Sequence, residues 1–227
     1  MSQAAKPLEE EGAKGPAAEP RALPQWVIDS LLRPATRVVS RTLWRIAFRG
    51  REHIPAAGGL VIAANHQTYF DPFWISVAFD RPIRYLAWNE AFKWPLAGKP
   101  LEWLGAWPLA LDRGNPTAYR RSLQWLRGGG AVMIFPEGAR AEADGALARF
   151  KAGAARLALE AGVPVLPVTI RGGERIWPRG QRWPRLGRVE IVFDPLRRLA
   201  PLPGEDARHC AQRETQDLAA VIKSELK

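Results

Sequence analysis

Short apolar runs alternate with amphipathic helical patterns along most of this chain, and this alternation restricts its fold more than any other feature. The apolar runs predict strands at Leu60–Ala64, Ile83–Ala87, Trp107–Leu111, Ala131–Phe135, Val165–Ile170 and Val189–Phe193. The helical patterns lie at Pro72–Phe79, Pro116–Arg127, Lys151–Glu160 and Asp206–Leu226, with shorter pieces near 91–103. Strands separated by helices predict an α/β fold, a largely parallel central sheet flanked by helices. Reactive side chains then gather in the loops where strands end.

The N-terminal region differs from the rest of the chain. Residues 1–23 carry glutamates among Ala, Pro and Gly, and we expect a disordered tail there, without the apolar core of a signal peptide. Residues 24–49 predict an amphipathic helical hairpin or a kinked helix, because Pro34 suits the first turn of a second helix. We expect residues 50–227 to form one domain. No stretch reaches the ~18 apolar residues of a membrane span.

Arginine recurs at every fourth position in the N-terminal segment, at Arg33, Arg37, Arg41, Arg45 and Arg49. At about 100° per residue this spacing drifts by about 40° a step, so it predicts a basic band along one side of a helix. The opposite side, expected to face the protein, carries Ala35, Val39, Leu43 and Ile46. Val38, Trp44 and Phe48 fall among the arginines, a combination typical of a helix on anionic lipid. The alternative is a solvated face whose aromatic side chains pack on a neighbouring element.

The net charge of +10 predicts anionic partners, which leaves nucleic acid, anionic lipid headgroups and phosphorylated substrates open. The Pro-rich segment 174–188 contributes to this charge, since it carries Trp177 and Trp183 among five arginines. The single cysteine, Cys210, excludes an intramolecular disulfide and a Cys-rich metal site.

His66 is the first candidate for chemistry, because it directly follows the predicted strand Leu60–Ala64. Asp71 comes five positions later, and a turn between the two would let its carboxylate reach back to the imidazole. A carboxylate on one ring nitrogen fixes the tautomer and leaves the other nitrogen free to take a proton. The alternative for Asp71 is helix capping, since Asp followed by Pro is typical of a helix N-terminus.

A second candidate follows the strand that ends near Phe135. There a Pro–Gly turn presents Glu137 and Arg140, and a guanidinium held in this way suits forked binding of phosphate. An ordinary loop salt bridge is the alternative. A third candidate is Arg113, which ends another strand together with Asp112.

These pieces, in order and spacing, resemble the four sequence blocks of the glycerolipid acyltransferases, the 1-acyl-glycerol-3-phosphate acyltransferase family. The first block matches at Asn65, His66 and Asp71, and the second at Gly105 and Arg113. The third matches at Phe135, Pro136, Glu137, Gly138 and Arg140, and the fourth is the apolar strand around Pro167. The resemblance covers roughly residues 50–195.

The resemblance implies that His66 deprotonates the acceptor hydroxyl and that Asp71 orients His66. It implies that Arg113, Glu137, Gly138 and Arg140 hold a phosphate-bearing lysophospholipid, most simply 1-acyl-glycerol-3-phosphate. The acyl donor is then a thioester, acyl-CoA or acyl carrier protein, and no metal or other cofactor is expected. The expected location is peripheral, on an anionic membrane surface at the cytoplasmic face.

The chain departs from the family pattern at three places. Ala139 and Ala141 replace a usual Thr and Ser, and Trp88 and Asn89 occupy a stretch where many members carry a Lys. Another lysolipid or a glycolipid therefore stays open as acceptor. A non-catalytic protein that binds RNA or DNA through its arginines is the alternative of another class. Such a protein has no use for His66 and Asp71 in register with Glu137 and Arg140, so no nucleic acid is expected.

Overall fold

The structure is a computed structural model that describes residues 23–93, 98–109 and 116–226. Its centre is a sheet of seven strands in the order β1-β7-β6-β2-β5-β3-β4. The strands are β1 (Ala47–Arg49), β2 (Leu60–Ala64), β3 (Ile83–Trp88), β4 (Trp107–Leu109), β5 (Ala131–Ile134), β6 (Val165–Arg171) and β7 (Glu190–Phe193). Every neighbouring pair is parallel except β6 and β7. The predicted α/β fold with a largely parallel sheet is confirmed.

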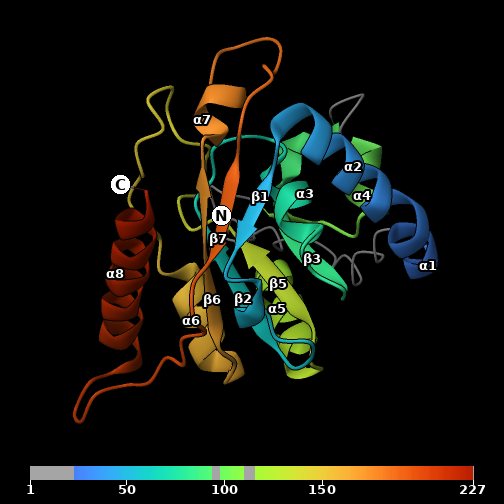
Figure 1. Ribbon diagram of the computed structural model, residues 1–227. Coiled ribbons are helices and arrows are strands. Elements are labelled where there is room, and N and C mark those ends of the chain that lie inside the picture. The colour runs from blue at the N-terminus through green and yellow to red at the C-terminus, as the bar shows by residue number, and fades with distance from the viewer. Residues whose placement is uncertain (1–22, 94–97, 110–115, 227) are drawn as a thin grey trace, which may run out of the picture.

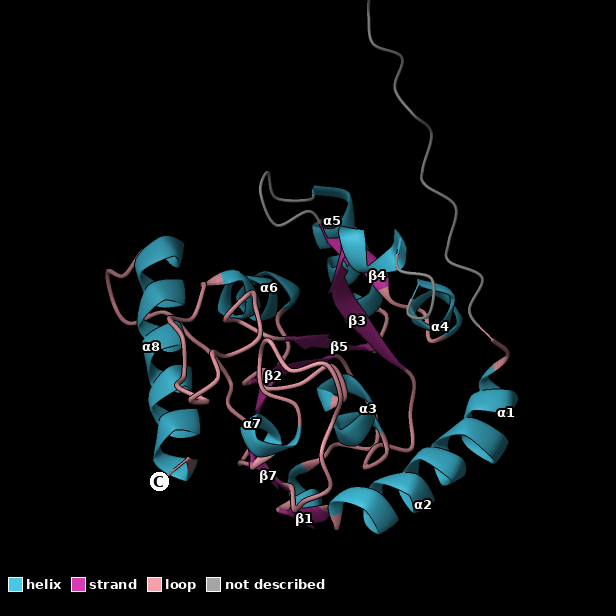
Figure 2. Cartoon of the chain, turned by 90° about the horizontal axis from the view of Figure 1, so that it is seen from above, coloured by secondary structure: helices cyan, strands magenta, loops and turns pink. Residues whose placement is uncertain are grey.

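Helices cover both faces of the sheet (Figure 1). The longer ones are α2 (Arg33–Trp44), α3 (Asp71–Ser76), α4 (Gly98–Trp103), α5 (Pro116–Arg127), α6 (Gly153–Ala161) and α8 (Ala207–Glu225). Short helical pieces are α1 (Gln25–Val27), η1 (Ile28–Leu32), η2 (Arg51–His53), η3 (Asn89–Lys93) and α7 (Gly173–Ile176). Seen from above in Figure 2, α5, α6 and α8 lie on one side of the sheet, and α2 and α3 lie on the other.

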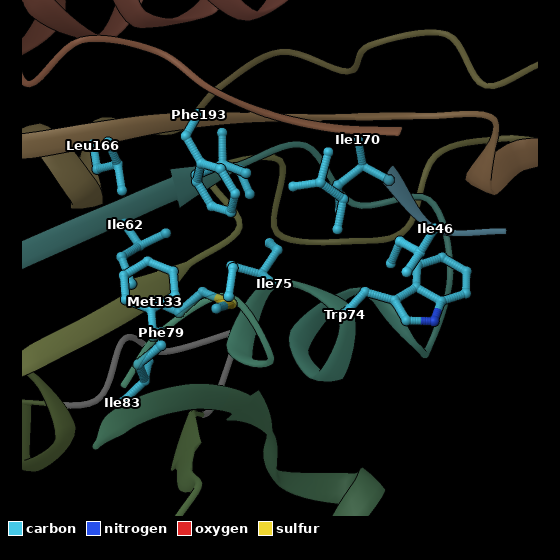
Figure 3. Packing of buried hydrophobic residues seen from close by; sticks show 14 of the residues in the cluster. Ile46, Ile62, Trp74, Ile75, Phe79, Ile83, Met133, Leu166, Ile170 and Phe193 are labelled. Carbon is cyan, nitrogen blue, oxygen red and sulfur yellow. The ribbon is translucent and has the colours of Figure 1, made fainter. Parts of the chain in front are cut away.

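The alternation of side chains along β2 builds two hydrophobic layers. Leu60, Ile62 and Ala64 point into the layer under α3, whereas Val61 and Ala63 point into the layer under α5, α6 and α8. All five side chains are fully buried, as a strand with helices on both faces requires. Figure 3 shows the α3 layer, where the labelled side chains are Ile46, Ile62, Trp74, Ile75, Phe79, Ile83, Met133, Leu166, Ile170 and Phe193.

The N-terminal segment is not a helical hairpin. Residues 25–44 form one helical run of α1, η1 and α2, in which Pro34 occupies the first turn of α2 without breaking the run. The helix ends at Trp44 because Arg45 adopts a left-handed conformation with φ 42°. Residues 47–49, predicted to be helical, form strand β1 instead, paired in parallel with β7.

The predicted orientation of this helix is wrong in part: Val38, Arg41 and Arg45 are exposed as predicted, whereas other positions are not as predicted. Arg33 and Arg37 lie against the protein: Arg37 donates to the carbonyl of Val77 over 2.7 Å, and Arg33 pairs with Asp29 at 2.8 Å. Val39 and Leu43, predicted to face the protein, are exposed, and Trp44 is buried instead. Val77 is the C-cap of α3, so Arg37 meets a helix end that attracts cations. The predicted tail falls almost entirely on residues 1–22, which lie outside the described residues.

Candidate active site

The site begins where β2 ends. The side-chain amide of Asn65 donates to the carbonyl of Ile170 over 2.9 Å, and its oxygen accepts from the Ile170 N–H over 2.7 Å. Asn65 thus continues the pairing of β2 with β6 by one residue through its side chain. The chain then turns away from the sheet at a fixed point, and His66 is the first residue after that point.

The imidazole of His66 and the carboxylate of Asp71 are in direct contact, with Nδ1 2.8 Å from Oδ2. Asp71 is completely buried and begins α3. The same Oδ2 accepts from the backbone N–H groups of Gln67 and Thr68 at 2.6 and 2.9 Å, and Oδ1 accepts from the Thr68 hydroxyl at 2.7 Å. The carboxylate of Asp71 therefore turns back over its own loop and does not cap α3. The turn predicted between the two residues is present.

This geometry determines which nitrogen of His66 can act. An ionised carboxylate only accepts hydrogen bonds, so Nδ1 carries the proton that joins the ring to Asp71. The other nitrogen, Nε2, then has a free lone pair that can take a proton from a hydroxyl. The side chain of His66 keeps 19% of its surface exposed, so it is not sealed inside the protein.

The loop after β5 fixes His66 from two further sides. The ring of Phe135 stacks on the imidazole, with centroids 4.1 Å apart and planes 20° apart. The N–H of Ala141 donates to the carbonyl of His66 over 2.7 Å. Ala141, one of the departures from the family pattern, therefore holds the His66 loop through its backbone N–H.

Glu137 faces His66 and not an open surface. Its Oε1 accepts from the His66 N–H at 2.7 Å, and its Oε2 accepts from the Ala148 N–H at 2.8 Å. Burial raises the pKa of Glu137, against the lowering effect of these two hydrogen bonds. The contact with phosphate that the sequence predicts for Glu137 does not fit this arrangement, because its buried carboxylate is bound to backbone and would repel an anion. Its observed contacts fasten the His66 loop to the loop after β5.

Arg140 is the cation of this loop. Its guanidinium lies over the ring of Tyr69, with Cζ 3.7 Å from the ring centroid, and Nη1 lies 3.4 Å from the carbonyl of Trp177. Among the described residues no carboxylate pairs with it. The loop salt bridge given above as the alternative is therefore not found among the described residues, where Arg140 is a half-buried cation without a carboxylate partner.

The model of the acyltransferase family matches residues 45–171, which is more than half of the chain. The chain belongs to the acyltransferase family. This stretch contains β2, β5 and both loops of the site, so the predicted resemblance is confirmed.

Several relatives of this acyltransferase-family chain carry the name 1-acyl-sn-glycerol-3-phosphate acyltransferase. One from Pseudomonas aeruginosa is 33% identical over 70% of this chain and 61% of its own length. One from Bacillus subtilis is 27% identical over 84% of this chain and 89% of its own length. The chloroplastic LPAT1 of Arabidopsis thaliana is 31% identical over 60% of this chain. The chain spans 61% and 39% of the lengths of the Pseudomonas and Arabidopsis proteins.

A solved structure has the same fold. The crystal structure of the 1-acyl-sn-glycerophosphate (LPA) acyltransferase PlsC from Thermotoga maritima matches with a TM-score of 0.70 and 23% sequence identity. The match covers 89% of this chain and 79% of the other.

Gly138 and Lys151 add a feature to the acyltransferase site that the sequence analysis did not assign. Gly138 has φ 75°, and a Cβ at this position would lie 2.7 Å from Nζ of Lys151. Glycine at 138 thus gives the turn its left-handed conformation and leaves room for an exposed ammonium. Lys151 comes sixteen residues after Phe135 in the sequence, and nothing in the sequence indicates that its ammonium lies close to Gly138. Arg113 lies outside the described residues, so its predicted contact remains a prediction.

Two other features lie apart from the acyltransferase site. Cys210 is buried in α8, and burial raises the pKa of its thiol, which disfavours the nucleophilic thiolate. A cavity of about 310 Å³ lies under α1 and α2 beside Phe73, Ser76 and Tyr85. Neither His66 nor Asp71 lines it.

Proposed function

We propose that this protein transfers a fatty acyl group from a thioester to the hydroxyl of 1-acyl-glycerol-3-phosphate, giving phosphatidic acid. One observation carries the proposal: the imidazole of His66 is held by the buried carboxylate of Asp71, on a loop whose Tyr69 contacts the guanidinium of Arg140, which pairs with no carboxylate of the described residues. This arrangement joins a base for a hydroxyl to a cation for a phosphate. The names of the relatives support the same acceptor.

In the proposed reaction Nε2 of His66 takes the proton of the acceptor hydroxyl as its oxygen attacks the thioester carbonyl. The new C–O bond gives a tetrahedral intermediate, whose collapse breaks the C–S bond. The imidazolium returns its proton to the departing thiolate, so the products are an ester and a free thiol. General base action of this kind contributes about 10²–10⁴-fold. The thioester supplies the leaving group, and the reaction calls for no resident metal or other cofactor.

In this proposal Arg140 binds the phosphate, and Lys151 is a second cation beside the same turn. Arg113 is expected to join them on the strength of the family resemblance. Glu137 takes the part of a positioning residue, because its carboxylate holds the backbone of His66. Acyl-CoA and acyl carrier protein are both candidate donors, and a different lysolipid or a glycolipid is the alternative acceptor.

We also propose that the protein works on an anionic membrane surface, at the cytoplasmic face where such lipids give a negative surface potential. No helix among the described residues has the length and apolar character to cross a bilayer. The outer side of α2 instead exposes Val38, Val39 and Leu43. The loop of residues 177–188 exposes Trp183 and Leu186 at 70% and 75%.

The outer side of α2 and the 177–188 loop are joined, since the N–H of Gly187 and the indole of Trp44 bind the carbonyls of Leu43 and Arg185. The same two segments carry exposed arginines: Arg41, Arg45, Arg179, Arg182, Arg185 and Arg188. On an anionic bilayer, the apolar side chains would enter the acyl-chain region and the arginines would bind the charged headgroups above it. The lipid acceptor would thus be taken up where it resides.

The test is an assay of purified protein with 1-oleoyl-glycerol-3-phosphate and either acyl-CoA or acyl carrier protein, with products identified by mass spectrometry. We expect phosphatidic acid with at least one donor, and little product from lysophosphatidylcholine or monoacylglycerol. His66→Ala should lower kcat at least about 10²-fold. His209→Ala is the matched control, because His209 is exposed on α8 and pairs with Asp206. Retained activity in His66→Ala, or no phosphatidic acid with either donor, contradicts the proposal.

A further inference from the structure

Tyr69 is one of the four residues between His66 and Asp71 and is 39% exposed. Its ring supports the guanidinium of Arg140 from one face, with Cζ 3.7 Å from the ring centroid. A cation this close to the centre of an aromatic ring is attracted by the negative face of the ring. Tyr69 is therefore the contact through which the His66 loop meets Arg140.

The ring of Tyr69 is itself held in place. The indole of Trp177 packs against it edge to face, with centroids 5.2 Å apart and planes at 76°. Trp177 also contacts Phe70 at 5.1 Å and donates from its indole N–H to the carbonyl of Gln181 over 2.9 Å. The carbonyl of Trp177 in turn accepts from Arg140. Arg140 thus rests on a ring that a second aromatic residue keeps from turning.

Stacking of this kind leaves the binding edges of the guanidinium free. All five N–H donors of an arginine lie in the guanidinium plane, and a ring on one face occupies none of them. Within the described part of the chain, the carbonyl of Trp177 is the single hydrogen-bond acceptor of Arg140, and no carboxylate neutralises it. A carboxylate partner would fix the group but would compete with phosphate. Tyr69 fixes it without competing.

We infer that Tyr69 is a positioning residue that orients Arg140 for the phosphate of the acceptor, an inference that rests on the proposed function. Tyr69 and His66 are three positions apart on one loop. Because that loop carries both the base and the support for the phosphate-binding cation, it fixes the distance between the phosphate and the base. The acceptor is then selected for the spacing between its phosphate and its free hydroxyl, and not for negative charge alone.

The experiment compares Tyr69→Phe and Tyr69→Leu by steady-state kinetics on 1-oleoyl-glycerol-3-phosphate. Phe keeps the ring face, so its KM should stay within about twofold of the unmodified protein. Leu removes the ring face, so KM for the acceptor should rise about 3- to 20-fold. KM for the acyl donor should not change, and kcat should fall less than about threefold. Merely weakened packing would alter these parameters together, whereas loss of phosphate orientation raises KM for the acceptor.

A double-variant cycle tests the route of the effect. Arg140→Gln alone should raise KM for the acceptor about 10- to 100-fold, the effect expected for loss of a charge-assisted hydrogen bond. Tyr69→Leu should add less than a further twofold in the Arg140→Gln background, because there is no longer a guanidinium to orient. Circular dichroism and thermal unfolding of each variant show whether it is folded, and Tyr69→Met, which also lacks the ring face, serves if Tyr69→Leu is not.

The outcomes separate the two ideas. An unchanged KM in Tyr69→Leu, an equal rise in Tyr69→Phe, or an undiminished rise in the Arg140→Gln background would each overturn the role of Tyr69. The last two outcomes would mean that its hydroxyl or another contact acts on the acceptor directly. An unchanged KM in Arg140→Gln itself would instead overturn the phosphate binding assigned to Arg140 in the proposed function.

Discussion

The carboxylate of Glu137 accepts a hydrogen bond from the backbone N–H of His66, with 2.7 Å between Oε1 and N. The other carboxylate oxygen, Oε2, accepts from the N–H of Ala148. The buried side chain of Glu137 thus links two loops that are about seventy residues apart in the sequence. The backbone of His66 is thus held from one loop, while its ring is held by Asp71 from its own loop. The proposed base has little freedom to move away from its position.

Asp71→Asn should lower kcat about 10²–10⁴-fold with a smaller effect on KM. An asparagine amide can present an N–H to Nδ1 of His66, which would shift the ring proton to Nε2 and block the lone pair that must accept a proton. Steady-state kinetics at saturating donor measures this. Thr68→Val is the control: it removes the hydroxyl that donates to Oδ1 and accepts from the Phe70 N–H, leaves the contact of Asp71 with His66 intact, and should cost less than about tenfold. Asp71→Asn with more than a tenth of the original kcat would count against the assigned tautomer.

Glu137→Gln should destabilise the protein by about 1–3 kcal/mol, because the new amide group leaves one of two backbone N–H groups without an acceptor. The cost should depend on pH. Burial raises the pKa of Glu137 in the folded protein. Its contribution to stability is therefore fully present below the unfolded pKa and is lost as pH rises through the folded pKa.

Between the unfolded and the folded pKa, the folded state binds more protons than the unfolded state. Glu137→Gln therefore lowers the free energy of unfolding more at pH 4 than at pH 8. Urea unfolding of both proteins at the two pH values measures the difference. A cost that grows with pH would mean that the pKa of Glu137 is lowered on folding.

Trp183→Ser combined with Leu186→Ser should weaken binding to vesicles of phosphatidylglycerol and phosphatidylcholine at least about tenfold, because two large apolar side chains no longer enter the lipid. Co-sedimentation at low and high salt separates this loss from the contribution of the arginines, which salt screens. Leu196→Ser with Leu202→Ser is the matched control, since both leucines are exposed between β7 and α8. Equal losses from the two pairs would place the lipid contact elsewhere.

The sequence was sufficient for the buried strands of the sheet because these carry continuous apolar runs with clear ends. β2 was predicted at its observed bounds, and α5 likewise. The strand β1 was missed because Ala-Phe-Arg has no pattern of its own, and its partner β7 lies about 140 residues away. Pairing at that distance is a tertiary effect that local pattern does not reveal.

The orientation of α2 was missed for a different reason. The prediction assigned arginines to the outside, but the stems of Arg33 and Arg37 can lie along the protein while their guanidinium groups reach carbonyl oxygens. Charge alone does not tell whether such a group meets solvent or the end of another helix. With Arg33 and Arg37 turned inward, the apolar residues Val39 and Leu43 are on the outside.

For the site, the sequence predicted the pairing of His66 with Asp71, because strand end, turn and helix start leave few other geometries. It did not predict the direction of Glu137, since a glutamate in a Pro–Gly turn can face solvent or backbone equally well. It also gave no sign that Tyr69 lies under Arg140, because that contact depends on how two loops from different strands are placed side by side.

The position of β1 affects how shortened versions of this protein should be designed. Among the strands that the structure describes, β1 pairs with β7 alone, along Ala47–Arg49, and the ring of Phe48 stacks on that of Phe193. Removal of the N-terminal helix by a cut at residue 50 would also take away this strand, leaving β7 as an open edge that invites association with other chains. A version without the helix should therefore start before Ala47, so that solubility reports on the helix and not on a bare strand.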